Sequence, residues 1–113
     1  MSEQCLKYLN FSNSFEKINK RYKLTEYKQV KVLEAVINAH MEGVTLSVLD
    51  LILMKEIASQ ATLHSITKLL IDSKLIKTEL CKEDGRRKYI LPTKLGISWL
   101  NDCSVMLISA HKK

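Results

Sequence analysis

The side chains best suited to chemistry fall into two groups: short polar residues within 59–68 and a run of cations at 86–88. The first group is Ser59, Gln60, Thr62, His64, Ser65 and Lys68, and the second is Arg86, Arg87 and Lys88. Hydroxyl, amide and imidazole groups can hydrogen-bond to the edges of nucleic-acid bases, and consecutive cations attract phosphate groups. Either group alone would also fit an ordinary solvated surface. Together they predict contacts with double-stranded DNA.

Other kinds of chemistry lack the residue patterns that they need. The sequence shows no nucleophile–base pair, carboxylate pair, glycine-rich phosphate loop or metal-ligand spacing, so we expect no enzyme, no cofactor and no metal. The cysteines and histidines are scattered along the chain: Cys5, Cys81 and Cys103, and His40, His64 and His111. An odd number of widely spaced cysteines without C-x-x-C predicts reduced thiols in a cytoplasmic protein, rather than a disulfide framework or a zinc site.

Length and charge narrow the class of protein. The 113 residues, of which 46% are hydrophobic and 27% charged, predict one globular domain with a single core. No apolar run reaches the roughly 18–20 residues of a membrane span, and the first residues lack the layout of a secretory signal. The net charge is +6, and its positive excess falls in 1–24, 60–90 and 91–113, whereas 25–59 is acidic. This distribution favours a polyanionic partner, nucleic acid first.

The polar group lies on a predicted helix over 60–73. Ser59 precedes it as an N-cap, because its hydroxyl can accept from the first free N–H groups. Apolar residues recur at spacings of three and four, at Leu63, Ile66 and Leu70, which predicts a buried stripe. The opposite face carries the polar group and no acid before Asp72. Such a face suits a helix that lies against bases and phosphates.

Two further helices are predicted before this one. Thr25 is the expected N-cap of the first, Gly43 ends it, and its apolar stripe is Tyr27, Val30, Leu33, Val36, Ile37 and Met41. Ser47 and Asp50 match a capping box, which starts a second helix running from Val48 to about Ile57. This short helix, a tight turn near Ala58 and the polar-faced helix form a helix-turn-helix by pattern.

A β-hairpin is predicted after the polar-faced helix, over 77–91. Thr78 and Leu80 alternate with charged residues, which predicts a half-buried strand, and Asp84-Gly85 is a typical hairpin turn. The chain returns as a strand at 89–91 and is stopped by Pro92, while 44–46 is long enough only to pair with the end of this hairpin. A hairpin with cations at its tip beside a helix-turn-helix is typical of a wing that contacts DNA backbone or minor groove.

The two ends of the chain are predicted to be amphipathic. Near the N-terminus, Phe11, Phe15, Ile18 and Tyr22 share one helical face, and the first ten residues fray or form a separate turn. After the expected cap Thr93, the C-terminal apolar stripe is Leu95, Trp99, Leu100, Cys103, Met106, Leu107 and Ala110. Each terminal helix either packs on its own domain or joins a homodimer. We therefore divide the chain into an N-terminal extension (1–24), a winged helix-turn-helix (25–92) and a C-terminal helix that is a candidate for dimerisation (93–113).

Residues 25–100 resemble the MarR-type winged-helix transcription regulators. The closest likeness is the wing tip Asp84-Gly85-Arg86-Arg87, the return strand Tyr89-Ile90-Leu91 and the T-x-x-G start of the next helix at Thr93 and Gly96. The resemblance implies a mainly α (α+β) winged helix-turn-helix fold, a homodimer, a transcriptional role and double-stranded DNA as partner. It also implies that the polar group faces the major groove, that the arginines lie in the wing, and that Asp84 holds one of them. The chain departs from the family at Pro92 and Lys74, and it is shorter, which reduces both dimer-forming ends.

Two functions follow from these observations. In the first, the chain is a sequence-specific DNA-binding regulator that reads the major groove with helix 60–73 and the backbone or minor groove with wing 77–91. In the second, it is a winged-helix protein-interaction module, such as an accessory subunit of a replication or mobile-element assembly. Leu69 and Ile71 favour the second function, because both lie beside the buried stripe and are expected to be partly exposed.

Overall fold

The computed structural model describes residues 2–80, 85 and 87–111, so the predictions for Cys81, Asp84 and Arg86 lie outside the described residues. In chain order the elements are α1 (Glu3–Arg21), α2 (Tyr27–Met41), β1 (Leu46–Ser47), α3 (Val48–Ile52), α4 (Gln60–Asp72), β2 (Ile76–Leu80), β3 (Lys88–Pro92) and α5 (Lys94–His111). The predicted class, mainly helical with a small antiparallel sheet, is confirmed.

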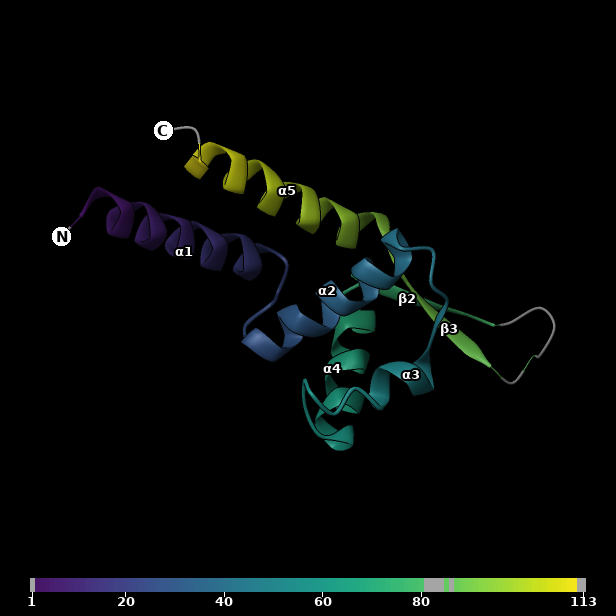
Figure 1. Ribbon diagram of the computed structural model, residues 1–113. Helices are drawn as coiled ribbons and strands as arrows, with labels where there is room; N and C mark the ends of the chain where they lie inside the picture. Colours follow the sequence, from purple (N-terminus) through teal and green to yellow (C-terminus); the bar gives the residue numbers. More distant parts are fainter. Residues whose placement is uncertain (1, 81–84, 86, 112–113) are drawn as a thin grey trace.

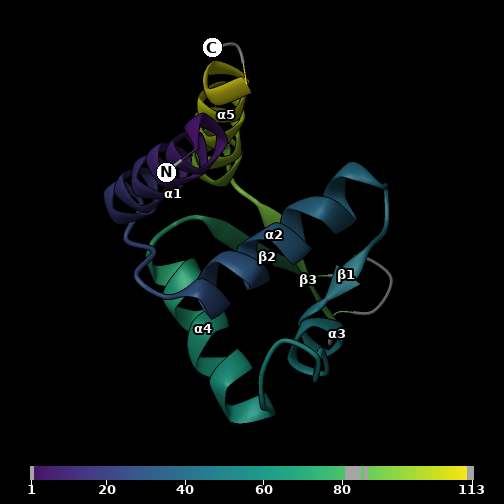
Figure 2. The same ribbon diagram turned by 60° about the vertical axis from the view of Figure 1, so that its left-hand side comes forward.

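The helices form two groups with different surroundings. Helices α1 and α5 lie side by side and form an arm that projects from the rest of the molecule, and both chain ends lie at its free end (Figure 1). The remaining helices and the sheet form a body, with α4 on one side of the sheet and α3 beside the start of β3 (Figure 2). The molecule is accordingly elongated, with extents of 55 × 25 × 22 Å.

The sheet places the hairpin beside the helix-turn-helix. Its strand order is β1-β3-β2, with all pairs antiparallel, and Leu46 of β1 pairs with Ile90 of β3. The prediction that the segment 44–46 pairs with the hairpin is therefore confirmed at Leu46 alone, because β1 begins there and ends at Ser47. Pro92 is the last residue of β3, opposite Ile76, whereas we expected the strand to stop before it. A proline fits this position because the end of a strand need not donate an N–H to the ladder.

The predicted half-buried strand is wrong beyond Ile76. Thr78 and Leu80 are exposed, Leu80 to 59%. The reason is that the outer half of β2, at the edge of the sheet, extends away from the helices, as Figure 1 shows. The hairpin is consequently a projecting element of the fold.

The core confirms the periodicity of α4 and most of that of α2. Leu63, Ile66 and Leu70 are buried, as are Val30, Leu33, Val36 and Ile37. The predicted stripe is wrong at its two ends, since Tyr27 is 72% exposed and Met41 59%. These are the first and last residues of α2, where the helix extends beyond its neighbours. The Lys31 ammonium lies over the exposed Tyr27 ring, 5.9 Å from the ring centroid.

Helix boundaries differ from the prediction at three places. The N-cap of α2 is Glu26 instead of Thr25, and the backbone N–H groups of both residues donate to the Gln29 side-chain oxygen. Helix α1 starts at Glu3, because Ser2 caps it by accepting from the Cys5 N–H, so the first residues are helical and do not form a separate turn. Helix α3 ends at Ile52 instead of about Ile57.

The early end of α3 has a packing reason. Successive turns from Leu53 onward replace the helix and bring Ala58 into the core directly before the cap of α4. The predicted capping box at its start is confirmed: the Ser47 N–H donates to the Asp50 carboxylate at 3.1 Å, and the Asp50 N–H donates to the Ser47 hydroxyl at 3.0 Å. Gly43 has φ +72° directly after α2, as expected for a left-handed helix end.

Candidate nucleic-acid interface

The start of α4 is fixed by two of the predicted site residues. The Ser59 hydroxyl oxygen accepts from the Thr62 N–H at 3.3 Å, and the same hydroxyl donates to the Thr62 side-chain oxygen at 3.1 Å. Thr62 is half-buried and lines a hollow of about 310 Å³ together with Glu26 and Gln29. The two hydroxyls are therefore engaged with each other at the helix start, and Thr62 lies on the side of α4 that faces α2.

The other polar residues of α4 form an exposed strip. Gln60, His64, Ser65 and Lys68 are all exposed. Gln60, His64 and Lys68 follow one another at four-residue spacing, so they lie along one line of the helix surface, and Ser65 lies beside that line. We call these four residues the reading strip. Leu69 and Ile71 are each 36% exposed, as expected for residues next to the buried stripe.

The hairpin brings the second predicted group to the same surface. Arg87 and Lys88 line a hollow of about 550 Å³ together with Gln60 and His64 of the reading strip. Antiparallel pairing of β3 between β1 and β2 produces this arrangement, because it brings β3 against α3, which itself packs against α4. Four of the side chains that the sequence singled out at separate positions, Gln60, His64, Arg87 and Lys88, therefore line one hollow.

The floor of this hollow contains residues that the sequence did not single out for function. Val48 and Leu49, the first residues of α3, line it, and Leu49 is exposed. Asp50 lies next to them, and its pKa is held below the usual range, mainly because the Ser47 N–H and hydroxyl hydrogen-bond its carboxylate and to a smaller extent because of the Arg87 charge. The capping-box pattern located this segment, but no local pattern shows that the segment faces the wing.

The cations of this face form no ion pairs with described carboxylates, whereas several other cations of the molecule do. Lys20 is paired with Glu16 and Lys31 with Glu34 at 3.4 Å, and Lys77 is paired with Glu79 at 3.5 Å. Within the described residues, no carboxylate forms an ion pair with Lys68, Arg87 or Lys88. These three side chains keep their charge available for an external anion.

The described part of the chain holds neither a candidate metal site nor a candidate membrane span. No group of three or more histidine, cysteine, aspartate or glutamate side chains there could hold a metal ion. None of the helices in 2–80 and 87–111 is both long and apolar enough to cross a membrane. The half-buried Cys103 has a pKa raised to about 11, mainly by burial, which keeps it a thiol at neutral pH.

The two helices of the arm are held together by hydrogen bonds between their side chains. The buried Trp99 of α5 donates its indole N–H to the Asn19 side-chain oxygen of α1 at 2.8 Å. The Tyr22 hydroxyl, directly after α1, donates to the Asp102 carboxylate, which raises the tyrosine pKa, and it also lies 3.0 Å from the Ser98 hydroxyl. These bonds fix α1 and α5 relative to each other.

The combination of a helix-turn-helix, a three-stranded sheet and a projecting cationic hairpin defines a winged-helix protein. No family model matches the sequence, and no curated protein matches it. Solved structures do match. The DNA complex of MepR from S. aureus has a TM-score of 0.76 at 17% identity, and the match covers 93% of this chain and 82% of MepR.

Two further solved structures support the same fold. MepR bound to ethidium bromide matches with a TM-score of 0.72 at 16% identity over 99% of this chain and 79% of MepR. The heme sensor PefR, with heme and carbon monoxide, matches with a TM-score of 0.61 at 18% identity over 96% of this chain and 74% of PefR. MepR and PefR are MarR-type proteins. The chain therefore has the MarR-type winged-helix fold, as the motif resemblance predicted.

Proposed function

We propose that the protein is a sequence-specific double-stranded DNA-binding protein that acts as a small transcriptional regulator. One observation carries the proposal: Gln60 and His64 of the reading strip line one hollow together with the wing cations Arg87 and Lys88, and all four residues of the strip are exposed. MepR, which has the same fold, has been solved as a complex with DNA, and this supports the assignment.

Each part of the face has a distinct role in this proposal. The major groove of B-DNA is about 12 Å wide and admits one helix, so the reading strip enters it with Gln60, His64 and Ser65 facing base edges. Lys68 contacts a phosphate from the same helix. Arg87 and Lys88 contact the backbone or the minor groove beside it, together with Arg86, which lies outside the described residues. Ser59 and Thr62 were predicted to face the groove, but their mutual hydrogen bond favours a role in orienting the start of α4.

The proposed regulator works as a homodimer through its arm. Toward the free end of the arm, α1 and α5 expose large apolar side chains: Leu6, Tyr8, Leu9, Val105, Leu107 and Ile108. Apolar residues of this size on two adjacent helices fit burial against a second copy of the same surface. A two-fold dimer would present two α4 helices to one duplex. Because its partner is cellular DNA, we propose that the protein acts in the cytoplasm.

Selection of bound sequences from a pool of random duplexes tests the function directly. We expect enrichment of a two-fold symmetric sequence, because the spacing of half-sites mirrors the symmetry of a protein dimer. A His64→Ala variant should lose the preference for a particular base at specific positions within each half-site. A Lys7→Ala variant, on the remote part of the arm, should enrich the same sequence as the wild-type protein.

Two results would contradict the proposal. If the wild-type protein enriched no sequence and bound no duplex at about physiological salt, DNA binding would be excluded. Binding to protein partners that survives nuclease treatment would then favour the interaction-module function. If a non-symmetric sequence were enriched, sequence reading would stand and the dimer would be wrong.

A further inference from the structure

Two lysines hold backbone conformations that lysine rarely adopts. Lys23 has φ +66° and Lys74 has φ +64°, and among the described non-glycine residues they alone have positive φ. Lys23 follows the end of α1 and Lys74 follows the end of α4, where a left-handed residue reverses the chain. Glycine occupies such positions without steric cost, whereas an L-residue with a Cβ atom is strained. A charged side chain at both positions therefore calls for an explanation beyond the turn itself.

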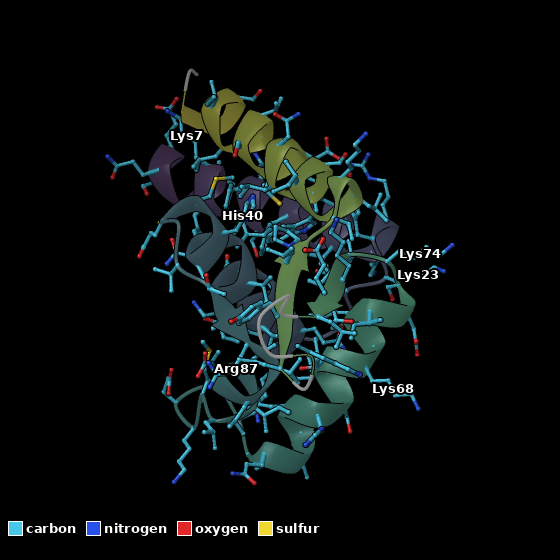
Figure 3. All side chains as sticks on the ribbon, turned by 90° about the vertical axis from the view of Figure 1, so that its right-hand side faces the viewer. Lys7, Lys23, His40, Lys68, Lys74 and Arg87 are labelled. Atoms are coloured by element: carbon cyan, nitrogen blue, oxygen red, sulfur yellow. The ribbon has the colours of Figure 1, made fainter. Side chains whose placement is uncertain are left out.

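The two lysines meet in space although they are far apart in sequence. Both line a hollow of about 540 Å³ together with Arg21. Figure 3 shows Lys23 and Lys74 next to each other, projecting from the same side of the molecule as Lys68 of α4. We call Arg21, Lys23 and Lys74 the basic flank. The Lys74 backbone is fixed in this arrangement, because the Thr93 hydroxyl donates to the Lys74 carbonyl oxygen at 2.6 Å.

The basic flank is continuous with the reading strip. A second hollow, of about 480 Å³, joins Lys23 to Ser65 and Lys68. The carboxylate of Asp72 lines both hollows, yet within the described residues no acidic side chain forms an ion pair with Arg21, Lys23 or Lys74. The neighbouring Lys20, in contrast, is paired with Glu16. The flank therefore presents cations whose charge is not neutralised by the chain itself.

The flank and the wing lie on opposite edges of the exposed face of α4. Gln60 and His64 border the hollow shared with the wing, whereas Ser65 and Lys68 border the hollow that leads to the flank. In Figure 3, Arg87 of the wing lies to the left of α4, whereas Lys23 and Lys74 lie beyond its upper right end. A helix that occupies the major groove lies between the phosphate backbones of two strands, so cations on its two sides face different strands.

We propose that the basic flank is a second phosphate-binding surface, which contacts the DNA strand opposite to the one that the wing reaches. This inference rests on the proposed DNA-binding function and extends its footprint past the end of α4. It also explains the two left-handed lysines, because the side chains contribute to binding at positions where glycine would serve the turn better.

The double variant Lys23→Gly/Lys74→Gly separates binding from folding. Glycine relieves the strained turns, so the melting temperature should stay unchanged or rise. Fluorescence-anisotropy titration with the duplex recovered by selection should show an affinity lower by about tenfold or more at about 0.1 M salt. The slope of log affinity against log salt should fall by about two for each bound protomer, and so by about 3.6 for the proposed dimer, since each lost phosphate contact removes about 0.9. A mixed-sequence duplex should lose affinity to a similar extent, because phosphates carry no sequence information.

Charge-matched controls make each outcome decisive. Lys7→Gln/Lys31→Gln removes two charges that lie away from the flank, one near the start of α1 and one on α2 that is paired with Glu34, and should leave affinity and slope unchanged. Lys23→Gln/Lys74→Gln should repeat the binding loss while keeping a side chain at each turn, and it replaces the glycine variant if that variant does not fold. Wild-type affinity and slope in a well-folded flank variant would overturn the inference while leaving the proposed function intact. If the wild-type protein bound neither duplex, the proposed function itself would fail.

Discussion

Polar side chains have opposite roles in the arm and in the surface formed by the reading strip and the wing cations, which we call the reading face. In the arm, the polar groups of Asn19, Tyr22, Asp102 and Trp99 are bonded to one another between α1 and α5. On the reading face, Gln60, His64, Ser65 and Lys68 are exposed, and the neighbouring wing cations form no ion pair with a described carboxylate. The polar side chains of the arm stabilise the fold through hydrogen bonds with each other, whereas those on α4 remain available to a partner.

Because of this difference, we expect variants of the arm to change stability and variants of the reading strip to change DNA affinity. Substitutions between α1 and α5 should lower the free energy of unfolding, because they leave buried groups unpaired or cavities unfilled. Substitutions on the reading face should change DNA affinity and leave folding nearly unchanged, because exposed side chains contribute little to stability.

The largest effect is expected for Trp99→Ala. This variant opens a cavity between α5 and the core and leaves the buried Asn19 side chain without its partner, so the free energy of unfolding should fall by about 3–5 kcal/mol. Urea denaturation followed by circular dichroism measures the change. Leu95→Ala, on the same helix but exposed, is the matched control and should cost much less. Similar losses in the two variants would show that the arm is not held by Trp99.

Gly96→Ala should come next. A Cβ atom at residue 96 would lie 2.3 Å from the Leu75 carbonyl oxygen, and the Gly96 N–H already donates to the Thr93 hydroxyl, so the start of α5 cannot move away freely. We expect a loss of about 2–3 kcal/mol by the same urea titration. Gly85→Ala, where nothing lies within 4 Å of the added atom, should be nearly neutral. An equally stable Gly96→Ala protein would contradict the close approach of α5 to the end of α4.

Asp50→Asn should have a smaller, pH-dependent effect at the edge of the reading face. The folded pKa of Asp50 lies below its unfolded value of 3.8, so its contribution to stability is present above that value and is lost as pH falls through the folded pKa. The variant should lose at most about 1 kcal/mol near neutral pH, because solvent screens this side chain. Thermal melts of both proteins from neutral to strongly acidic pH should converge on acidification. A constant difference across that range would show that the Asp50 charge does not contribute.

The smallest stability effect is expected for His64→Ala/Lys68→Ala. Both side chains are exposed on α4, and alanine has a high helix propensity, so the free energy of unfolding should change by no more than about 0.5 kcal/mol. The same protein should lose most of its affinity for the selected duplex. If this variant had a much lower free energy of unfolding than the wild-type protein, the reading strip would contribute to stability as the arm does, and the contrast between the two regions would be wrong.

Local patterns predicted the parts of the fold that depend on local packing. The burial of Leu63, Ile66 and Leu70 follows from helical periodicity, and the Ser47–Asp50 box follows from capping chemistry over four residues. Predictions failed where an element's neighbours decide the outcome. Tyr27 overhangs the end of α2, and Leu80 lies on a strand that no helix covers, although both fit an apolar pattern.

The candidate site shows the same division between local and long-range information. The reading strip could be chosen from the sequence, because it is the face of α4 opposite the apolar stripe. The wing cations could be placed beside it only through the order of helix-turn-helix and hairpin. Lys23 and Lys74 could not be brought together at all, since their proximity depends on how α1 and α4 end in the folded chain.

The most direct test of the central claim is the salt dependence of duplex binding by Arg87→Ala/Lys88→Ala, measured by anisotropy with the selected duplex. The claim is that the reading strip and the wing bind DNA together, so the variant should melt like the wild-type protein but bind at least about tenfold more weakly at about 0.1 M salt. Its slope of log affinity against log salt should be lower by about two for each bound protomer, and so by about 3.6 for the proposed dimer. Unchanged affinity and slope in a fully folded variant would contradict the claim, because the wing would then contribute no phosphate contact.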